Sequence, residues 1–442
     1  MKKRALFSYK VADNADFKEQ FFRYVKSEKN AFYLNSNQSA AKDSSYQLLV
    51  AVGCREMISV NQGNALDQLE LFQSQHNDWM FGWLGYDLKN QLEDLQSRSV
   101  DPLAIPDLCF IIPEHVFEIS NDEVTVHTFA SRESINHLIQ LVNQTSLEDS
   151  KLFNQQEAEI HSQYSREEYL EKAQNFLNHI QRGDIYEANF CTQFLAENVE
   201  FDDALAFQEL NEISTPPFSA WVRCGDYLVV SASPERYLKK KGPQLLSQPI
   251  KGTAKRHSDP AADQKLKNQL FKDTKERSEN VMIVDLVRND LSKTAVKGSV
   301  AVDELYGIYS FKQVHHMISS VTSQLREEFS GIDAIRTTFP MGSMTGAPKV
   351  SAMKIIEENE NFKRGLYSGA IGYVTPDGDF DFNVVIRTIL YNARLKKLSF
   401  AVGSALTIAA QPEKEYEECL LKAKALFKTL EKQGIKYKKE YA

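Results

Sequence analysis

Short apolar runs recur along this chain, separated by polar turns and by longer stretches with helical spacing. Runs at residues 48–52, 79–86, 109–112, 227–232 and 398–402 have the length and composition of buried strands. Two more, at 370–374 and 380–390, flank a Pro-Asp-Gly turn at 376–378. Because the predicted strands and helices come in blocks rather than as regular βαβ units, we expect an α+β fold.

Helical signals are clearest in the second half of the chain. Ser165 and Glu168 have the spacing of a capping box, apolar residues follow at helical intervals, and Gly183 is the expected stop. Further helical segments are expected at about 261–291, from Pro348 to about 358, and at about 413–432. The composition turns polar from about 143 to 163, which predicts a linker between an N-terminal region (1–150) and a second region (160–432), both within one compact unit.

Composition excludes several classes of protein. Of the 442 residues, 42% are hydrophobic and 25% charged, as in globular rather than disordered proteins. No apolar run approaches the roughly 20 residues that cross a bilayer. The start lacks the apolar core and cleavage site of a signal peptide, so we expect a cytoplasmic protein. The net charge of −8 argues against a nucleic-acid surface but leaves an anionic small substrate open.

Two pairs of glutamates are candidates for a metal site. Glu276 and Glu279 are three residues apart in a predicted helix, and Glu415 and Glu418 repeat this spacing in the last one, with Lys422 following. Each pair is explained by a solvated, salt-bridged helix surface. Together they are also explained by a magnesium site, since Mg²⁺ prefers hard oxygen ligands. Spacing leaves both explanations open.

Other candidate features are ambiguous or negative. Arg387 falls in the apolar run at 380–390. Burying an arginine there requires a partner, either a substrate carboxylate or a structural ion pair. The glycine-rich segment 342–349 lacks the Walker spacing and is expected to cap a helix. His315 and His316 are adjacent, so their side chains point in different directions. The five cysteines are odd in number and widely spaced, which predicts free thiols rather than disulfides or a zinc site.

Several of these segments together resemble one family, the chorismate-utilising enzymes. Its members include component I of anthranilate synthase and of aminodeoxychorismate synthase, and the isochorismate and salicylate synthases. The matching segments occur in the family's order over about residues 165–430, and they are Ser-Pro-Glu-Arg (233–236), Pro-Ile-Lys-Gly-Thr (249–253), 279–290, His316, 342–349, 369–373, Ile-Arg-Thr (386–388) and 415–422. The N-terminal third matches less strongly, mainly through residues 81–88.

The resemblance implies a fold and a set of roles. The fold would be two large antiparallel sheets packed orthogonally, with helices outside and the active site in a cleft. Glu279 and Glu418 would hold Mg²⁺ directly and Glu276 and Glu415 through water, so that the metal binds the ring carboxylate of chorismate. Glu235 would protonate the departing 4-hydroxyl, and His316 would lie beside the ring. The remaining residues implied in substrate binding are Gly252, Thr253, Tyr373, Arg387, Gly403, Ser404 and Lys422.

Lys251 marks the branch of the family. Anthranilate synthases usually have alanine at this position, whereas aminodeoxychorismate synthases have lysine. In that branch the lysine is thought to attack ring carbon 2 while the 4-hydroxyl leaves, after which ammonia adds at carbon 4. The reaction requires a neutral amine, so we expect its pKa to be lowered. The alternative is that Lys251 only pairs with a carboxylate.

Two positions depart from the family pattern. The position that is usually glutamine in the aminating enzymes, and lysine in the isochorismate and salicylate branch, is Glu187 here. The missing lysine argues against that branch, and the role of the carboxylate is left open, with Lys251 or ammonium as its partner. Near the carboxylate clamp a usual Gly-x-Gly reads Gly403-Ser404-Ala405.

The resemblance thus implies amination of chorismate to 4-amino-4-deoxychorismate, a transaminase-class reaction in the synthesis of 4-aminobenzoate and folate. No cysteine lies in a Gly-x-Cys-x-Gly segment, so a separate glutamine amidotransferase would supply ammonia. The alternatives are anthranilate synthase component I or another chorismate-converting enzyme, and a non-catalytic chorismate-binding subunit. Whether tryptophan binds the N-terminal region is left open.

Overall fold

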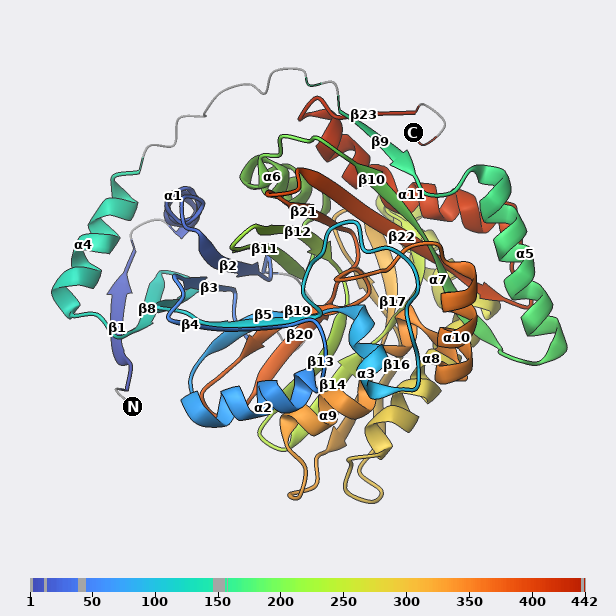
Figure 1. Cartoon of the computed structure of the whole chain (residues 1–442), viewed down its shortest axis with the longest axis horizontal. Coiled ribbons are helices and arrows are strands. Elements are labelled where there is room, and N and C mark those ends of the chain that lie inside the picture. The colour runs from blue at the N-terminus through green and yellow to red at the C-terminus, as the bar shows by residue number, and fades with distance from the viewer. Residues whose placement is uncertain are drawn as a thin grey trace.

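The computed structural model describes residues 3–11, 14–38, 45–145, 156, 158–438 and 441. Two β-sheets form its centre (Figure 1). The larger runs in space through β1 (Ala5–Lys10), β8 (Glu123–Thr128), β7 (His115–Ser120), β3 (Leu48–Val52), β2 (Asn30–Asn35), β11 (Phe218–Cys224), β12 (Tyr227–Ser233), β21 (Thr388–Asn392), β22 (Lys397–Thr407), β10 (Glu187–Ala196), β9 (Glu159–Ser162) and β23 (Lys436–Tyr437), with β18 (Gly346–Ala347) on β10.

The smaller sheet has one edge in the N-terminal part of the chain. It runs through β15 (Ile250–Lys255), β17 (Val314–Gln324), β14 (Gln244–Gln248), β13 (Arg236–Lys241), β20 (Phe380–Val384), β19 (Ala370–Val374), β5 (Met80–Leu84), β6 (Leu108–Ile112) and β4 (Glu56–Val60), with β16 (Ala301–Ser310) on β17. The named strands pair antiparallel, except for the parallel pair of β9 and β23. With the helices, this confirms the α+β class.

Helices lie around the two sheets, as the positions of α2, α4 and α5 illustrate (Figure 1). Their bounds are α1 (Asn14–Val25), α2 (Ala65–His76), α3 (Lys89–Leu92), α4 (Arg132–Asn143), α5 (Arg166–Arg182), α6 (Asp203–Ser214), α7 (Pro260–Lys272), α8 (Thr274–Ser292), α9 (Gly331–Thr338), α10 (Lys349–Asn359) and α11 (Pro412–Glu431), with 3₁₀ turns η1 (Tyr86–Leu88) and η2 (Gly342–Met344). Within the described ranges, none of the helices is long and apolar enough to cross a membrane.

Both sheets contain strands from both predicted regions, which meet at one junction in each sheet. In the larger sheet β2 pairs with β11, and in the smaller sheet β5 pairs with β19. The N-terminal third therefore completes its sheets only with strands from the rest of the chain. Most of the predicted linker lies outside the described residues.

The packing of β5 between β19 and β6 explains why an apolar run contains glycine. Gly82 lies opposite Gly372, and a Cβ on Gly82 would meet the carbonyl oxygen of Cys109 at 2.1 Å. Cys109 lies on β6, which pairs with β5 on the side away from β19, so a side chain at Gly82 would force β5 and β6 apart. Trp79, Phe81 and Tyr373 pack around the β5–β19 contact, with ring centroids 6.0–6.1 Å apart.

Local signals in the sequence correspond well to the elements. Ser165 and Glu168 form the predicted capping box of α5, and Gly183 ends that helix with a φ of +86°. The helical segment at 261–291 is two helices, because Asp273 ends α7 and its side chain accepts the Glu276 N–H as the cap of α8. Pro348 precedes α10 rather than being its first residue.

The predicted strand at 380–390 is two strands in different sheets. β20 ends at Val384 in the smaller sheet and β21 begins at Thr388 in the larger one. Between them Arg387 has a φ of +52°, in the left-handed region, which interrupts strand geometry. Arg387 therefore lies where the chain crosses from one sheet to the other, rather than inside a strand.

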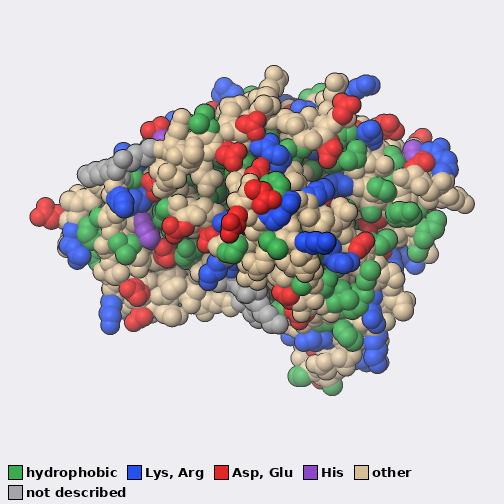
Figure 2. Space-filling view, turned by 90° about the horizontal axis from the view of Figure 1, so that it is seen from below, with side chains coloured by type: hydrophobic (Ala, Val, Ile, Leu, Met, Phe, Trp, Pro, Cys, Tyr) green, Lys and Arg blue, Asp and Glu red, His purple; other side chains and the backbone are tan. Residues whose placement is uncertain are grey.

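The surface has no broad area of one charge on the face shown in Figure 2. Acidic and basic side chains are interspersed there.

Candidate active site

The site residues come from both sheets and from two helices. Lys251 lies on β15, at one edge of the smaller sheet, and Glu187 begins β10 of the larger. Glu235 lies between β12 and β13, and Arg387 lies in the crossing from β20 to β21. The four candidate metal ligands lie on α8 and α11.

Lys251 and Glu187 form a buried ion pair that connects the two sheets. The Lys251 Nζ is 2.5 Å from the Glu187 Oε1, and both side chains are at least nine-tenths buried. Burial acts to lower the pKa of Lys251, but the charges of Glu187 and Glu279 outweigh it and leave that pKa raised. The expected lowering is thus not found, and the amine is held as an ammonium ion. The pairing considered as the alternative is present.

Glu235 is suited to carry a proton. Its side chain is buried, and this burial raises its pKa to about 7, although Lys251 and Arg387 act in the opposite direction. Its position is held by the backbone, since Val384 N donates to the Glu235 carbonyl at 3.0 Å. A carboxyl group that is about half protonated near neutral pH is an effective general acid.

Arg387 has no carboxylate within ion-pair distance in the described part of the chain. Its Nη2 donates to the Nε2 of His316 at 3.4 Å, and burial lowers its pKa to about 10. The structural ion pair considered for Arg387 is therefore not seen. Its guanidinium is available for an anionic ligand.

His316 is held as a neutral ring. Burial, followed by the charge of Arg387, places its pKa well below the usual value. Because Arg387 can only donate, the His316 Nε2 accepts, and Nδ1 carries the proton toward Thr253 Oγ1 at 2.9 Å. His315 instead contacts Asp263 through Nε2 at 3.1 Å, so the two neighbouring side chains point apart as expected.

The four glutamates gather around Lys275. The Lys275 Nζ lies 3.7 Å from Glu279 Oε1 and 3.5 Å from Glu415 Oε1, so it connects α8 to α11. Glu276 and Glu418 also attract this ammonium group. Burial raises the pKa of Glu279 to about 7, and it also raises the pKa of Glu276.

Lys422 and Ser404 hold the α11 glutamates against β22. Burial acts to raise the pKa of Glu418, but Lys422, 2.8 Å away, lowers it overall. The same Lys422 Nζ donates to the Gly403 carbonyl at 2.9 Å, and the Ser404 hydroxyl donates to Glu415. The predicted clamp residues Lys422, Gly403 and Ser404 thus lie beside the acidic cluster.

The acidic cluster offers the oxygen ligands that a hard cation prefers. In the described residues no three potential ligands are already gathered closely enough to hold a metal. However, Glu279 and Glu415 are buried, and Glu279 Oε1 has no hydrogen-bond partner within the same residues. Carboxylate oxygens only, with a cationic Lys275 among them, fit Mg²⁺ rather than zinc. The solvated-surface explanation does not fit the burial of Glu279 and Glu415, although the Glu418 side chain is 46% exposed.

Two predicted substrate-binding residues have contrasting positions. Gly252 has a φ of +86°, and a Cβ there would lie 3.1 Å from Glu276 Oε2, so it lies against the acidic cluster. Tyr373 lies on β19, separated from β15 by four strands, or about 24 Å at the usual strand spacing. It packs against Tyr46, Trp79 and Phe81, and the structure does not bring it to the other site residues.

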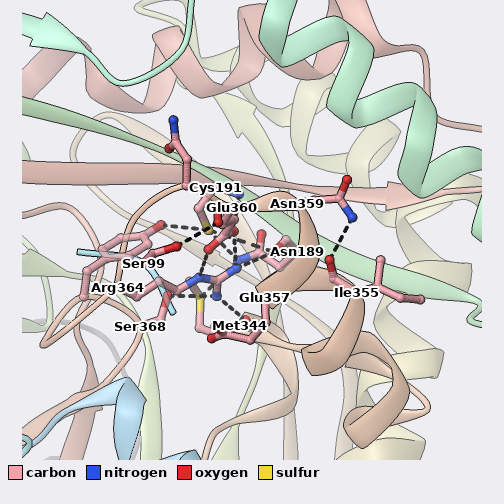
Figure 3. Close-up of polar contacts among 12 residues, drawn as sticks. Ser99, Asn189, Cys191, Met344, Ile355, Glu357, Asn359, Glu360, Arg364 and Ser368 are labelled. Atoms are coloured by element: carbon pink, nitrogen blue, oxygen red, sulfur yellow. Dashed lines mark hydrogen bonds and ion pairs between the residues drawn. The ribbon is translucent and has the colours of Figure 1, made fainter. Parts of the chain in front are cut away.

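An arginine that sequence reasoning missed holds β10 in place (Figure 3). Arg364 binds both carboxylate oxygens of Glu360, at 2.8 and 2.6 Å. It also donates to the carbonyls of Met344 and Asn189, each at 2.7 Å. The pair joins β10, two residues from Glu187, to the 342–347 segment. No local pattern marks it, and Lys275 was equally hidden because a Lys-Glu spacing of four is typical of exposed helices.

Comparisons with known proteins agree with this geometry. A family model described as chorismate binding enzyme matches residues 24–428. Aminodeoxychorismate synthase component 1 of Escherichia coli is 34% identical over 83% of this chain and 81% of its own length. Anthranilate synthase component 1 of Thermus thermophilus is 32% identical over 79% and 77%. The crystal structure of anthranilate synthase component I from Streptococcus pneumoniae superposes with a TM-score of 0.76, at 26% identity over 88% of this chain and 94% of that one.

Proposed function

Since the chain belongs to the chorismate binding enzyme family, we propose that it is component I of an aminodeoxychorismate synthase, which converts chorismate and ammonia to 4-amino-4-deoxychorismate. Relatives with two different products match at 34% and 32% identity, so overall similarity does not choose between them. The observation that carries the choice is Lys251, whose buried ammonium lies among Glu187, Glu235 and Glu279. A lysine here provides a nucleophile that alanine would not.

Lys251 and Glu235 perform the covalent step. The Lys251 nitrogen attacks ring carbon 2, the ring double bonds shift, and the bond from carbon 4 to the hydroxyl oxygen breaks. Glu235 donates the proton that lets this oxygen leave as water, which its raised pKa supports. Ammonia then bonds to carbon 4 and the bond from carbon 2 to Lys251 breaks, which frees the amine.

The substrate is held by its carboxylates. Arg387, with no carboxylate partner in the described residues, binds one of them together with Lys422 and the backbone at Gly403. Glu276, Glu279, Glu415 and Glu418 would hold Mg²⁺, which would supply positive charge for the ring carboxylate. Neutral His316 and Thr253 lie beside the ring.

Ammonia comes from a separate glutamine amidotransferase. Four of the five cysteines are buried, and burial raises the pKa of Cys191 and of Cys419. Buried thiols of this kind are poor nucleophiles for glutamine hydrolysis. The name of the Escherichia coli relative, component 1, also supports a second component.

The product assay tests the proposal. The purified chain is incubated with Mg²⁺, chorismate and ammonium, and we expect 4-amino-4-deoxychorismate, identified by chromatography and mass spectrometry. Anthranilate as the product would favour the second candidate, an anthranilate synthase, and refute the first. Lys251→Ala should lower turnover at least about 100-fold. Lys396→Ala, which removes a surface ammonium paired with Glu200, is the matched control and should leave turnover unchanged.

A further inference from the structure

Glu187 differs from a buried carboxylate built for structure alone. The carboxylate of Glu360 accepts two hydrogen bonds from Arg364 and one from the backbone N–H of Cys191, so both its oxygens are satisfied (Figure 3). Glu187 is as deeply buried, but among the described residues it accepts from one donor only, the ammonium of Lys251. In the described part of the chain its Oε2 has no hydrogen-bond partner. Such an orphaned buried oxygen requires an explanation.

We propose that Glu187 is a catalytic base, which takes a proton from Lys251 before the amine attacks chorismate and returns it at the end of the cycle. This rests on the proposed function, because it requires Lys251 to be the nucleophile. An ammonium nitrogen has no lone pair and cannot attack carbon 2. In the described residues, the acceptor that is hydrogen-bonded to Lys251 Nζ is Glu187 Oε1, at 2.5 Å. Both groups are buried, so bulk water does not provide an equivalent route.

The steps balance in protons and electron pairs. Transfer of one proton from Lys251 to Glu187 gives a neutral amine and a neutral carboxyl. The amine's lone pair forms the bond to carbon 2, carbon 4 loses its oxygen, and Glu235 supplies the proton that makes water. Ammonia then bonds to carbon 4 and becomes the product's ammonium group. The electron pair of the bond between carbon 2 and nitrogen returns to the Lys251 nitrogen, which takes back its proton from Glu187. Glu235 regains its proton from the ammonium ion that is the source of the ammonia.

The surrounding charges assign this role to Glu187. Glu235 is the acid that protonates the departing hydroxyl, and burial keeps it partly protonated. Glu279 contacts Lys275 and belongs to the acidic cluster. The other charged groups that act on Lys251 or its neighbours are Glu276, Glu418, Lys275 and Arg387. The raised pKa of Lys251 means that its proton leaves rarely by itself, so a directly bonded acceptor matters.

Glu187→Gln is the decisive variant. The amide still accepts a hydrogen bond from Lys251 but cannot take a proton. With Mg²⁺, chorismate and ammonium, we expect kcat at pH 7 to fall about 100-fold, the usual scale for a general base. KM for chorismate should stay within about threefold, and the deficit should shrink about tenfold per pH unit as the equilibrium fraction of neutral Lys251 amine rises. Glu200→Gln, on the surface, is the control.

The outcomes separate this proposal from the function on which it rests. The product of the unaltered protein and the Lys251→Ala rate test the function without involving Glu187. An unchanged kcat in Glu187→Gln, or a loss that is the same at every pH, would overturn the role of Glu187 as base. Glu187→Ala with added formate provides a second readout. Formate should restore turnover and chloride should not, because chloride replaces the charge without accepting a proton; equal rescue by both would also overturn it.

Discussion

Arg364→Met is expected to destabilise the protein strongly. The Arg364 side chain is 1% exposed and the Glu360 side chain 3%, and the substitution removes the two hydrogen bonds between them. Among the described residues it leaves the buried charge of Glu360 with only the Cys191 N–H as a donor, and it leaves the carbonyls of Met344 and Asn189 without this partner. Removing one member of a buried ion pair costs about 3–5 kcal/mol.

Guanidinium titrations followed by tryptophan fluorescence measure this change in the free energy of unfolding. Arg394→Met is the matched control, because Arg394 lies 3.8 Å from Asp226 with both side chains more than half exposed, and we expect no measurable change there. A loss below about 1 kcal/mol for Arg364→Met would contradict the reasoning, since it would mean that water or another donor compensates Glu360.

Four further predictions concern the site. With rates normalised to free ammonia, kcat should fall about tenfold per pH unit above about 7, because Glu235 then loses the proton it donates; a rate that rises through this range would contradict the assignment. Arg387→Lys should raise KM for chorismate about 10-fold, measured by steady-state kinetics, because the ammonium keeps the charge but loses the planar fork. Chelation with EDTA should abolish turnover and Mg²⁺ should restore it; full activity after dialysis against chelator would contradict the metal site on α8 and α11. Tyr373→Phe should leave kcat and KM within about twofold, since four strands separate β19 from β15, and a large loss would place Tyr373 back in the site.

The sequence predicts those structural features that depend on residues close together in the chain. The capping box at Ser165 and the strand at 370–374 rest on local hydrogen bonding and on length and turn signals, and both are found. The break at Arg387 is not predicted, because the run around it is uninterrupted in apolar character and a left-handed arginine is a product of tertiary context.

In the candidate site, too, local features could be predicted and tertiary contacts could not. The residues that bear the chemistry could be named from their motifs, but their contacts could not. Glu187 and Lys251 are 64 residues apart and on different sheets, so no periodicity relates them. Lys275 shares the spacing of an ordinary surface pair with Glu279, yet its ammonium also contacts Glu415 on another helix. Both relations arise only when distant elements pack.

The pairing of N-terminal strands with strands from later in the chain has a consequence during synthesis. Leu84 on β5 pairs with Ala370 on β19, which leaves the ribosome about 290 residues later, or roughly 15–60 s at ordinary elongation rates. During that time the apolar sequence Met-Phe-Gly-Trp-Leu of β5 has an edge without its partner strand, a state that favours association with other chains. We therefore expect nascent chains that end before residue 370 to depend on chaperones, and fragments that lack β19 to aggregate.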